Sequence, residues 1–406
     1  MKILYIHQYF NTPTMVGSTR SYEMAIRFVS KGNEVHIITT NRDEISSKKT
    51  IETVEDGIYV HWLPVPYSNN MSNFQRIIAF IKFVFRAYKA SIKIGGDIIF
   101  ATSTPLTVAI PSVFASKILK IPMVFEVRDL WPKVPIEMKE FTFPPLKWIS
   151  RWLERFAYRN SKHIIALSPG MKNGIIETGV DPKKVTVIPN SCDIKLFSVD
   201  NSEGLKFREK NSWIGTSPLI IYCGTLGKVN GLSFMVDIAS HSKEINPDLK
   251  FLIIGEGREK KMVIERAEEK GVLNQNLYIL DSIPKNELPS VMNAATLTSS
   301  FVINNKVLWD NSANKFFDSL AAGKPIMINH EGWQADILRD SGAGIVVPPD
   351  NPVEAARILN DFISDNDKQI KFSEAAKKLA SEKFDRDKLA YQLLEVLLNV
   401  KETSVK

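Results

Sequence analysis

The sequence predicts an α/β protein built from two doubly wound, Rossmann-like domains, because of its length and the spacing of its apolar runs. At 406 residues the chain is longer than one hydrophobic core usually supports. Short apolar runs rich in β-branched residues alternate with helical stretches in both halves, which is typical of parallel sheets covered on both faces. Ligands of such sheets bind beyond the carboxyl ends of the strands, so we expect the two domains to face one another across a ligand-binding cleft.

The first half of the chain begins this alternation. A helical pattern runs from Ser18, which is suited to cap it, to Lys31, and Gly32 is suited to end it. The strands expected here are residues 2–10, 34–40, 97–103, 123–129, 163–169 and 185–191. Together these elements predict an N-terminal domain over residues 1–195.

The second half repeats the scheme. The strands expected here are residues 219–225, 249–257, 277–282, 297–301, 325–330 and 344–350, with a helix over 259–271. They predict a second domain over residues 196–383. Residues 384–406 are expected to form a closing amphipathic helix that packs back toward the N-terminal domain.

Composition narrows the functional classes. The hydrophobic share of 44% and charged share of 24% are those of a folded globular chain. The two cysteines have no zinc or disulfide spacing, and the six histidines do not cluster at ligand spacing, so we predict a cytoplasmic protein with no metal and no cofactor. No apolar run is long enough for a membrane span or a secretory signal. The net charge of +7 suits an anionic partner, which we expect to be a small molecule or a membrane surface rather than nucleic acid.

Two expected helices are both basic and aromatic. In residues 73–93, four cations recur at helical spacing: Lys82, Arg86, Lys89 and Lys93. Residues 146–159 carry Trp148, Trp152 and three arginines. Such helices can lie in a membrane interface, which predicts a peripheral site on an anionic membrane. The alternative is an ordinary domain helix with a solvated basic face.

The segment 310–325 carries the chemistry expected of the second domain. It reads DNSANKFFDSLAAGKP and follows the strand expected at 297–301. Ser312 has the side chain of an N-cap, which would start a helix with Asn314 and Lys315 in its first turn. The N–H groups and the positive dipole end of a helix bind phosphate, and Lys315 adds a full charge.

Two carboxylates flank this helix start. Asp310 precedes the cap and Asp318 lies one turn inside the helix, so each can accept hydrogen bonds from hydroxyl groups beside a bound phosphate. A nucleotide sugar has that layout, with a diphosphate between sugar and ribose hydroxyls. The candidate site residues of this segment are Asp310, Asn311, Ser312, Asn314, Lys315 and Asp318. The alternative is structural, with Asp310 in a loop and Asp318 paired to a surface lysine.

With these residues the chain resembles the retaining glycosyltransferases of family four, which have the GT-B fold. The resemblance rests on FFDSLAAGKPI, on GSTRSYEMAIRFVSKGNEVHIITT near the start, on HIIALSPGMKNGIIETGV with VTVIPNSCD, and on GAGIVVPPDNP. It implies that Asp310 lies beside the donor sugar, that Asp318 binds the ribose hydroxyls, and that transfer retains the anomeric configuration without a metal ion.

Three departures from the family pattern concern the site. Relatives usually carry an arginine and a lysine for the diphosphate where CGTLGKVNG has Thr225 and Asn230. The cations that remain to supply this charge are Lys228, Arg258 and Lys315. Where many members have a His-Asp pair, FEVRDLWP has Arg128 for substrate binding and Asp129 as a catalytic carboxylate. Both carboxylates of the 310–325 segment are aspartates where relatives have glutamates.

The glycine loop at 15–20 is a further candidate in the first domain. Gly17 in MVGSTR would let the backbone approach a diphosphate or an acceptor. The alternative is a plain tight turn.

The departures themselves resemble a bacterial subgroup that builds O-antigen or capsule and includes L-fucosamine (N-acetyl-L-fucosamine) transferases. This implies a UDP-sugar donor and a lipid-linked polyprenyl diphosphate acceptor at the inner face of the membrane. Two other functions stay open, namely a UDP-sugar epimerase of the same two-domain fold and a non-catalytic nucleotide-sugar-binding protein.

Overall fold

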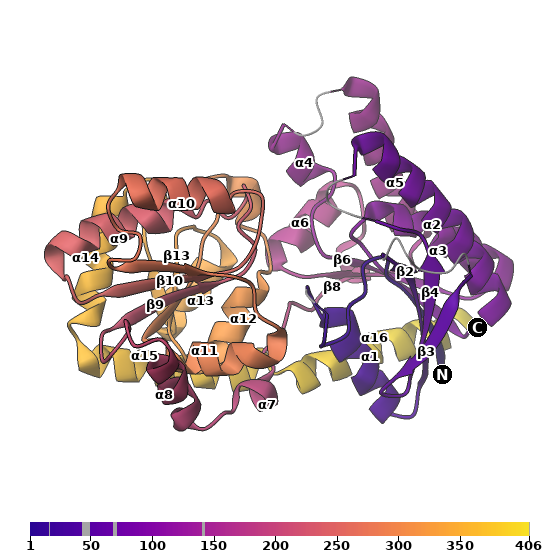
Figure 1. Ribbon diagram of the computed structural model, residues 1–406. Coiled ribbons are helices and arrows are strands. Elements are labelled where there is room, and N and C mark those ends of the chain that lie inside the picture. The colour runs from indigo at the N-terminus through magenta and orange to yellow at the C-terminus, as the bar shows by residue number, and fades with distance from the viewer. Residues whose placement is uncertain (16, 43–48, 68–70, 140–142, 406) are drawn as a thin grey trace. The chain divides into compact units, whose positions relative to one another are not determined.

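The computed structural model describes residues 1–15, 17–42, 49–67, 71–139 and 143–405, and it divides into two compact units (Figure 1). Unit 1 comprises Met1–Pro189 and Asp387–Lys406, and unit 2 comprises Asn190–Arg386. The predicted divisions, after residues 195 and 383, lie close to these points. Each unit holds one sheet with helices on both faces, so the doubly wound α/β class is confirmed.

Unit 1 contains an eight-stranded sheet in the order β3-β4-β2-β1-β5-β6-β7-β8. Its strands are β1 Lys2–Ile6, β2 Glu34–Asn41, β3 Ile51–Glu55, β4 Ile58–Pro64, β5 Ile98–Thr102, β6 Met123–Val127, β7 His163–Ala166 and β8 Val185–Val187. All pairs are parallel except β3 with β4. The strand order reverses between β1 and β5, which makes their carboxyl ends the expected ligand site of this sheet.

The β3–β4 hairpin was missing from the sequence prediction. Asp56 and Gly57 form its turn, both with positive φ, and Asp-Gly is the usual signal for a tight hairpin. The signal was therefore present in the sequence. The residues of β3 are mostly polar or exposed, so they lack the continuous apolar run that predicts a buried strand.

The helices of unit 1 cover the two faces of its sheet. They are α1 Arg20–Ser30, α2 Asn73–Ile94, α3 Ala109–Leu119, α4 Lys133–Glu137, α5 Pro144–Asn160, α6 Pro169–Glu177 and α16 Arg386–Val405, with 3-10 turns Leu106–Val108 and Pro182–Lys184. Alternate residues of β1 enter different cores, as the pleat requires. Leu4 packs in the core that includes Phe83 of α2, whereas Tyr5 packs in the core that includes Leu393 of α16.

The closing helix α16 belongs to unit 1 through both apolar and ionic contacts. Its leucines at 389, 393, 394 and 397 share a core with α1 and β1. Lys401 lies 3.1 Å from Asp97, and Asp387 lies 2.6 Å from Arg27. A chain segment from the end of the sequence thus completes one face of the first sheet (Figure 1).

Unit 2 contains a six-stranded parallel sheet in the order β11-β10-β9-β12-β13-β14. Its strands are β9 Leu219–Cys223, β10 Lys250–Ile254, β11 Leu277–Leu280, β12 Leu297–Ser300, β13 Ile326–Ile328 and β14 Gly344–Val346. The order reverses between β9 and β12, so the switch point of this sheet lies at their carboxyl ends.

The helices of unit 2 again lie on both faces of the sheet (Figure 1). They are α7 Ile194–Phe197, α8 Asn201–Lys210, α9 Ser233–Ile245, α10 Lys260–Glu269, α11 Leu288–Ala294, α12 Asn314–Ala321, α13 Trp333–Ser341, α14 Pro352–Ile363 and α15 Asn366–Lys383, with 3-10 turns Lys285–Glu287 and Lys306–Leu308. One core holds Phe316 and Phe317 of α12, which fixes the rotation of that helix against the sheet. The polar residues of α12 are thereby held at the carboxyl edge.

No helix in the described ranges is both long enough and apolar enough to cross a membrane.

Candidate functional site

The candidate residues of unit 2 gather at its switch point. The loop after β9 begins at Gly224, and the segment after β12 leads through a 3-10 turn into α12. Lys315 lies in the first turn of α12, and its side chain reaches the β9 loop. Its Nζ lies 5.0 Å from the centre of the Tyr222 ring, and a Cβ built on Gly224 would lie 3.1 Å from that Nζ. Gly224 therefore provides the space that Lys315 occupies.

The environment of Lys315 is unusual for a lysine. The side chain is half-buried, and desolvation lowers the pKa of the ammonium group to about 8, although Cys223 and Asp318 act in the opposite direction. A cation held in this way is incompletely compensated. An anionic ligand at the same point would restore the charge balance.

Thr225 and Asn230, which stand where the family usually has cations, shape the loop after β9. The backbone carbonyl of Thr225 accepts hydrogen bonds from the Tyr222 hydroxyl at 2.8 Å and from the Asn230 side-chain amide at 2.9 Å. The neighbouring loop packs closely against it, since a Cβ on Gly255 would lie 1.9 Å from the carbonyl oxygen of Gly224. The two loops thus form a continuous backbone wall at the edge of the sheet.

The other two candidate cations of this edge, Lys228 and Arg258, belong to these loops and are exposed. Of the three candidate cations, Lys315 is the one that lies in the first turn of α12, with its side chain against Tyr222 and Gly224.

Asp318 is buried one turn inside α12 and forms an ion pair with Lys285. The Lys285 Nζ donates to Oδ1 of Asp318 at 3.2 Å. The structural alternative, a lysine partner for Asp318, is thus realised. It does not exclude a ligand role, because a carboxylate has two oxygens and accepts several hydrogen bonds.

Ser312 is not the N-cap of α12, so that prediction is wrong. The N-cap residue is Ala313, which has no side-chain oxygen to offer the first-turn amides. The Ser312 hydroxyl instead accepts from the backbone N–H of Asn190 at 3.0 Å, and its carbonyl accepts from the Asn190 side chain at 2.5 Å. These two hydrogen bonds hold in place the segment that leads into α12.

The remaining candidates of this segment lie around the same helix start. Asn311 is half-buried, and its carbonyl accepts from the indole N–H of Trp333 at 3.2 Å. Asn314 is the first residue of α12 and is exposed. Asp310 is half-buried in the turn that follows the 3-10 segment.

In unit 1, Arg128 lies at the switch point and connects three segments. Its backbone N–H donates to Ser103 after β5 at 2.9 Å, and its guanidinium donates to Ser18 at 2.9 Å. It also contacts Nε2 of His7 after β1 at 3.3 Å. The N-cap of α1 is Thr19, so the prediction that Ser18 caps this helix is wrong, because the Ser18 hydroxyl is used by Arg128.

These contacts assign the tautomer of His7. Because a guanidinium only donates, Nε2 of His7 must accept, and its Nδ1–H donates to Ser21 at 2.9 Å. Burial and the charges of Arg128 and Arg42 lower the pKa of His7 well below its usual value. The imidazole is therefore neutral at physiological pH.

Asp129 and Gly17 lie at the same edge of the first sheet. Burial raises the pKa of the Asp129 carboxyl, and Arg128 and Thr104 offset this only in part. Gly17 has a φ of 133°, and a Cβ there would lie 2.6 Å from the side-chain nitrogen of Asn11. The backbone angle favours glycine at position 17, and an added Cβ would displace the side chain of Asn11.

A buried ion pair beside this edge was missed from the sequence. Arg20 and Glu126 lie 2.8 Å apart, and both side chains are almost fully buried. Arg20 also donates to the carbonyls of Pro189 and Ile188, and Thr102 donates to Glu126. Burial alone would raise the pKa of Glu126, but Arg20, Arg128 and the hydrogen bonds outweigh it and hold that pKa below its usual value.

The structure groups two histidines that are distant in sequence. Nδ1 of His36 lies 3.0 Å from Nε2 of His61, with Glu34 and Glu52 at the outer nitrogens. Within the described ranges, no set of three or more His, Cys, Asp or Glu side chains is placed to hold a metal ion.

Comparison with known proteins covers both units. Residues 17–196 match the family model described as Glycosyltransferase Family 4, and residues 205–379 match the model described as Glycosyl transferases group 1. The probable glycosyltransferase WbjE of Pseudomonas aeruginosa is 22% identical over 329 residues, which are 78% of this chain and 79% of that protein.

A second relative is the UDP-Gal:alpha-D-GlcNAc-diphosphoundecaprenol alpha-1,3-galactosyltransferase of Escherichia coli. It is 24% identical over 210 residues, which are 50% of this chain and 51% of that protein. The chain spans about half to two thirds of the length of most of the curated relatives it matches.

Among solved structures, HepE of Anabaena in complex with UDP-glucose superposes with a TM-score of 0.71 at 17% sequence identity. The superposition covers 98% of this chain and 100% of HepE, and it shows the GT-B fold. Glycosyltransferase family models thus match both halves of the chain, and the fold is that of HepE. The chain belongs to glycosyltransferase family 4.

Proposed function

We propose that this protein is an active glycosyltransferase that moves a sugar from a UDP-sugar donor to a lipid-linked saccharide acceptor on polyprenyl diphosphate. The proposed sugar is an N-acetylated deoxy amino sugar such as N-acetyl-L-fucosamine, and the proposed product is O-antigen or capsular polysaccharide. The protein is proposed to work as a peripheral protein at the inner face of the membrane.

The observation that carries the donor proposal is the placement of Lys315 beside Gly224, with Asp318 one turn further along α12. This puts an undercompensated cation, a helix N-terminus and a buried carboxylate at the switch point of one sheet. A nucleoside diphosphate offers two phosphates for the cation and helix end, and two ribose hydroxyls for the carboxylate. In this proposal Lys315 takes the place of the arginine and lysine that relatives usually carry where this chain has Thr225 and Asn230.

Catalysis in this proposal consists of positioning and of electrostatic stabilisation. As the bond to the sugar breaks, negative charge develops on the departing UDP, and Lys315 with the first-turn amides of α12 stabilises it. Asp310 and Asp129 are the proposed catalytic carboxylates. Lys228 and Arg258 remain proposed secondary contacts of the diphosphate.

The outer face of α2 supports a lipid-linked acceptor. Ala79, Phe83 and Ala87 pack into the core of unit 1. The opposite face exposes an apolar stripe, namely Phe74, Ile77, Ile78, Ile81 and Phe85. Lys82, Lys89 and Lys93 are exposed along one side of this stripe. A monomeric protein rarely leaves such a stripe in water, and its cationic flank suits anionic lipid.

The bacterial subgroup and the curated relatives support the proposed acceptor by analogy. The Escherichia coli relative named above acts, by its name, on a sugar carried by diphosphoundecaprenol. We propose an acceptor of the same chemical class. The preference for N-acetyl-L-fucosamine rests on the resemblance of FEVRDLWP, YCGTLGKVNGL and NSANKFFDSLAAGKP to that subgroup.

One assay tests the proposal against both rivals. The purified protein is incubated with a panel of UDP-sugars, including UDP-N-acetyl-L-fucosamine, with and without a synthetic polyprenyl diphosphate saccharide. Release of UDP that requires the acceptor, together with a product heavier by one sugar residue, is the expected result. Conversion of the UDP-sugar without acceptor would instead identify an epimerase, and tight binding without any turnover would identify a binding protein.

A further inference from the structure

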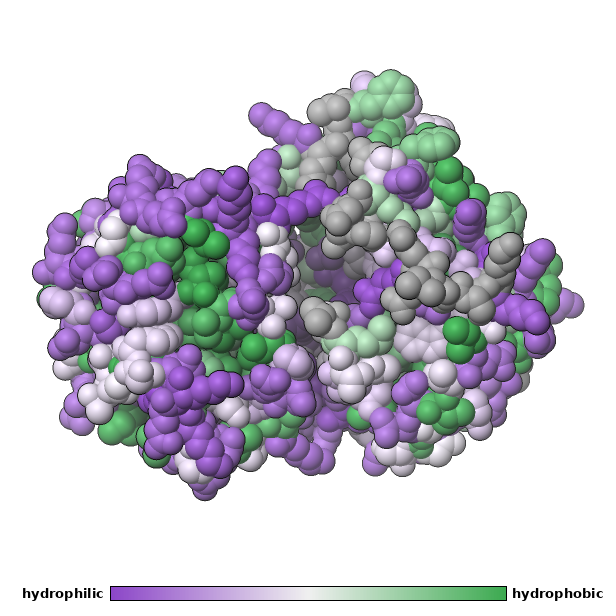
Figure 2. All heavy atoms as spheres, in the orientation of Figure 1, coloured by the Kyte–Doolittle hydropathy of each residue, from purple (hydrophilic) through white to green (hydrophobic). Residues whose placement is uncertain are grey.

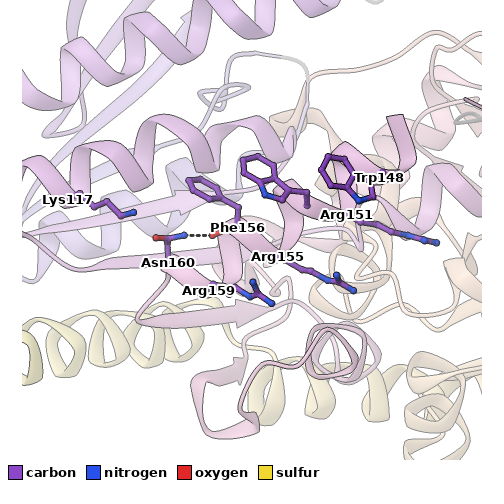
Figure 3. Close-up of a pocket in the computed structure, with 8 residues that line it drawn as sticks. Lys117, Trp148, Arg151, Arg155, Phe156, Arg159 and Asn160 are labelled. Carbon is purple, nitrogen blue, oxygen red and sulfur yellow. Dashed lines mark hydrogen bonds between the residues drawn. The ribbon is translucent and has the colours of Figure 1, made fainter. Parts of the chain in front are cut away.

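A basic pocket lies between α3 and α5 on the helical layer of unit 1 that also contains α2. Its volume is about 580 Å³, and it is lined by Lys117, Trp148, Arg151, Trp152, Arg155, Phe156, Arg159 and Asn160. α3 packs against both α2 and α5, so the pocket belongs to the same surface as the exposed stripe of α2 (Figure 1). Figure 3 shows Lys117 and Asn160 at one end of the pocket and Trp148 with Arg151 at the other.

The pocket carries four cationic side chains from α3 and α5. Arg151, Arg155 and Arg159 are four residues apart on α5, and together with Lys117 they are exposed. In the described part of the chain none of these four side chains forms an ion pair with a carboxylate. Exposed arginines of unit 2 behave differently, because Arg339 pairs with Glu331 at 2.6 Å and Arg357 pairs with Glu354 at 2.6 Å.

Aromatic side chains stand beside these cations. The exposed fractions of Trp148 and Trp152 are 69% and 52%. Trp152 stacks on Phe156 with ring centres 5.3 Å apart, and Phe114 of α3 lies 6.4 Å from Phe156. In the view of Figure 3 the rings of Trp148 and Phe156 form one row and the three guanidinium groups form a second row beside it.

The apolar rim extends beyond the pocket. Phe114 and Ile118 of α3 and Phe143, Leu146 and Ile149 at the start of α5 are also exposed. In the space-filling view, green side chains with purple ones among them follow the part of unit 1 that Figure 1 labels α5 (Figure 2). The cations are therefore surrounded by groups that gain by leaving water.

We infer that the pocket between α3 and α5 binds the phosphate group of an anionic lipid headgroup while the indoles of Trp148 and Trp152 enter the membrane interface. Guanidinium groups form paired, charge-assisted hydrogen bonds with phosphate oxygens. Indole rings favour the level of the lipid headgroups. A soluble phosphate compound would satisfy the arginines but would leave both exposed indoles in water, which is why a lipid is the occupant that fits.

The inference rests on the proposed work at a membrane but involves no residue of the proposed donor site. Trp148, Trp152 and the three arginines belong to unit 1, whereas Lys315 and Asp318 belong to unit 2. Binding of lipid and binding of UDP can therefore be lost separately. A failure of the lipid site leaves UDP binding intact, whereas a failure of the proposed donor site abolishes UDP binding and leaves lipid binding intact.

The test is vesicle sedimentation with the double variant Arg155→Gln/Arg159→Gln. Vesicles of phosphatidylcholine with and without phosphatidylglycerol are compared at low salt. We expect the wild type to bind the anionic vesicles and the double variant to bind them at least about tenfold more weakly. The matched control, Arg339→Gln/Arg357→Gln, removes the same net charge from unit 2 and is expected to bind like the wild type.

Quenching by brominated lipid provides the second measurement. The fluorescence of Trp148 and Trp152, assigned with Trp148→Phe and Trp152→Phe variants, should be quenched in anionic vesicles. The inference is overturned if both double variants lose binding equally, since that shows a general charge effect. It is also overturned if neutral vesicles bind as well, or if inorganic phosphate at constant ionic strength displaces the protein and the brominated lipid leaves both indoles unquenched.

Discussion

The ammonium group of Lys315 lies over the ring of Tyr222, 5.0 Å from its centre, at the carboxyl end of β9. Tyr222 is itself held in place, because its hydroxyl donates to the carbonyl of Thr225. The ring, the absent side chain of Gly224 and the first turn of α12 together fix a cation where a parallel sheet usually binds its ligand. Lys315 therefore places a positive charge at this edge, where the loop after β9 has Thr225 and Asn230 at the positions usually held by cations.

Replacing Lys315 with methionine should weaken UDP binding by about tenfold to a hundredfold, because a charge-assisted hydrogen bond contributes about 1.5–3 kcal/mol. Isothermal titration calorimetry measures this directly. The matched control is Lys368→Met, which removes a lysine that lies 5.7 Å from the ring of Phe372 on α15. Equal affinity for the wild type and Lys315→Met would exclude Lys315 from the diphosphate site.

Binding of UDP should be accompanied by proton uptake above neutral pH. In the free protein, burial lowers the pKa of Lys315 to about 8, and a bound diphosphate should raise it. Below this pKa the lysine is already protonated, so the affinity should be constant there and should fall as the pH rises through about 8. Calorimetry at about pH 8.5 in two buffers of different ionisation enthalpy measures the uptake, since the phosphates of UDP are fully ionised at that pH. Uptake that is the same in Lys315→Met would contradict this assignment.

The substitution Asp318→Asn should weaken binding of UDP more than binding of 2′,3′-dideoxy-UDP. If Asp318 accepts the ribose hydroxyls, the wild type should prefer UDP over the dideoxy compound by about tenfold or more, and the variant should lose this preference. The ratio separates a ligand role from the structural pairing with Lys285, because a purely structural change lowers both affinities alike. Asp336→Asn, at an exposed position of α13, is the matched control. A preference that survives in Asp318→Asn would remove this residue from the ribose site.

The substitution Glu126→Gln should destabilise unit 1 by about 3 kcal/mol or more, since it leaves the buried guanidinium of Arg20 without its charge partner. Because the folded-state pKa of Glu126 is lowered, its contribution should be complete above the unfolded pKa and should be lost as the pH falls through the folded pKa. Urea denaturation at neutral and acidic pH measures both effects. Glu177→Gln breaks the exposed pair with Lys133 and should cost less than about 1 kcal/mol. Equal losses for the two variants would show that the Arg20–Glu126 pair has no special role.

Most of the strands could be predicted from the sequence, because parallel strands buried on both faces are continuous apolar runs. Two predicted helix N-caps were wrong, because a serine hydroxyl can form a hydrogen bond either with the first turn of its own helix or with a distant residue. Ser312 and Ser18 both have hydroxyl groups suited to N-caps. The Ser312 hydroxyl instead accepts a hydrogen bond from Asn190, and the Ser18 hydroxyl accepts one from Arg128. No local sequence pattern predicts these two contacts.

The part of the candidate site that lies on one helix could be predicted from the sequence. The order of residues in 310–325 places Lys315 and Asp318 three positions apart on one helix face. Their neighbours Tyr222 and Lys285 come from other strands and loops and have no signal of their own. Glu126 did carry a signal, because a carboxylate in the apolar strand MVFEV must be buried and therefore needs a partner. The identity of that partner, 106 residues away, depends on the fold.

A crystal structure of the protein with UDP tests the central claim most directly. The proposed donor site predicts a phosphate oxygen within about 3 Å of Lys315 Nζ and the ribose hydroxyls within about 3 Å of the Asp318 carboxylate. A diphosphate bound to Lys228 or Arg258 and away from the first turn of α12, or a ribose that leaves Asp318 paired with Lys285 alone, would contradict it.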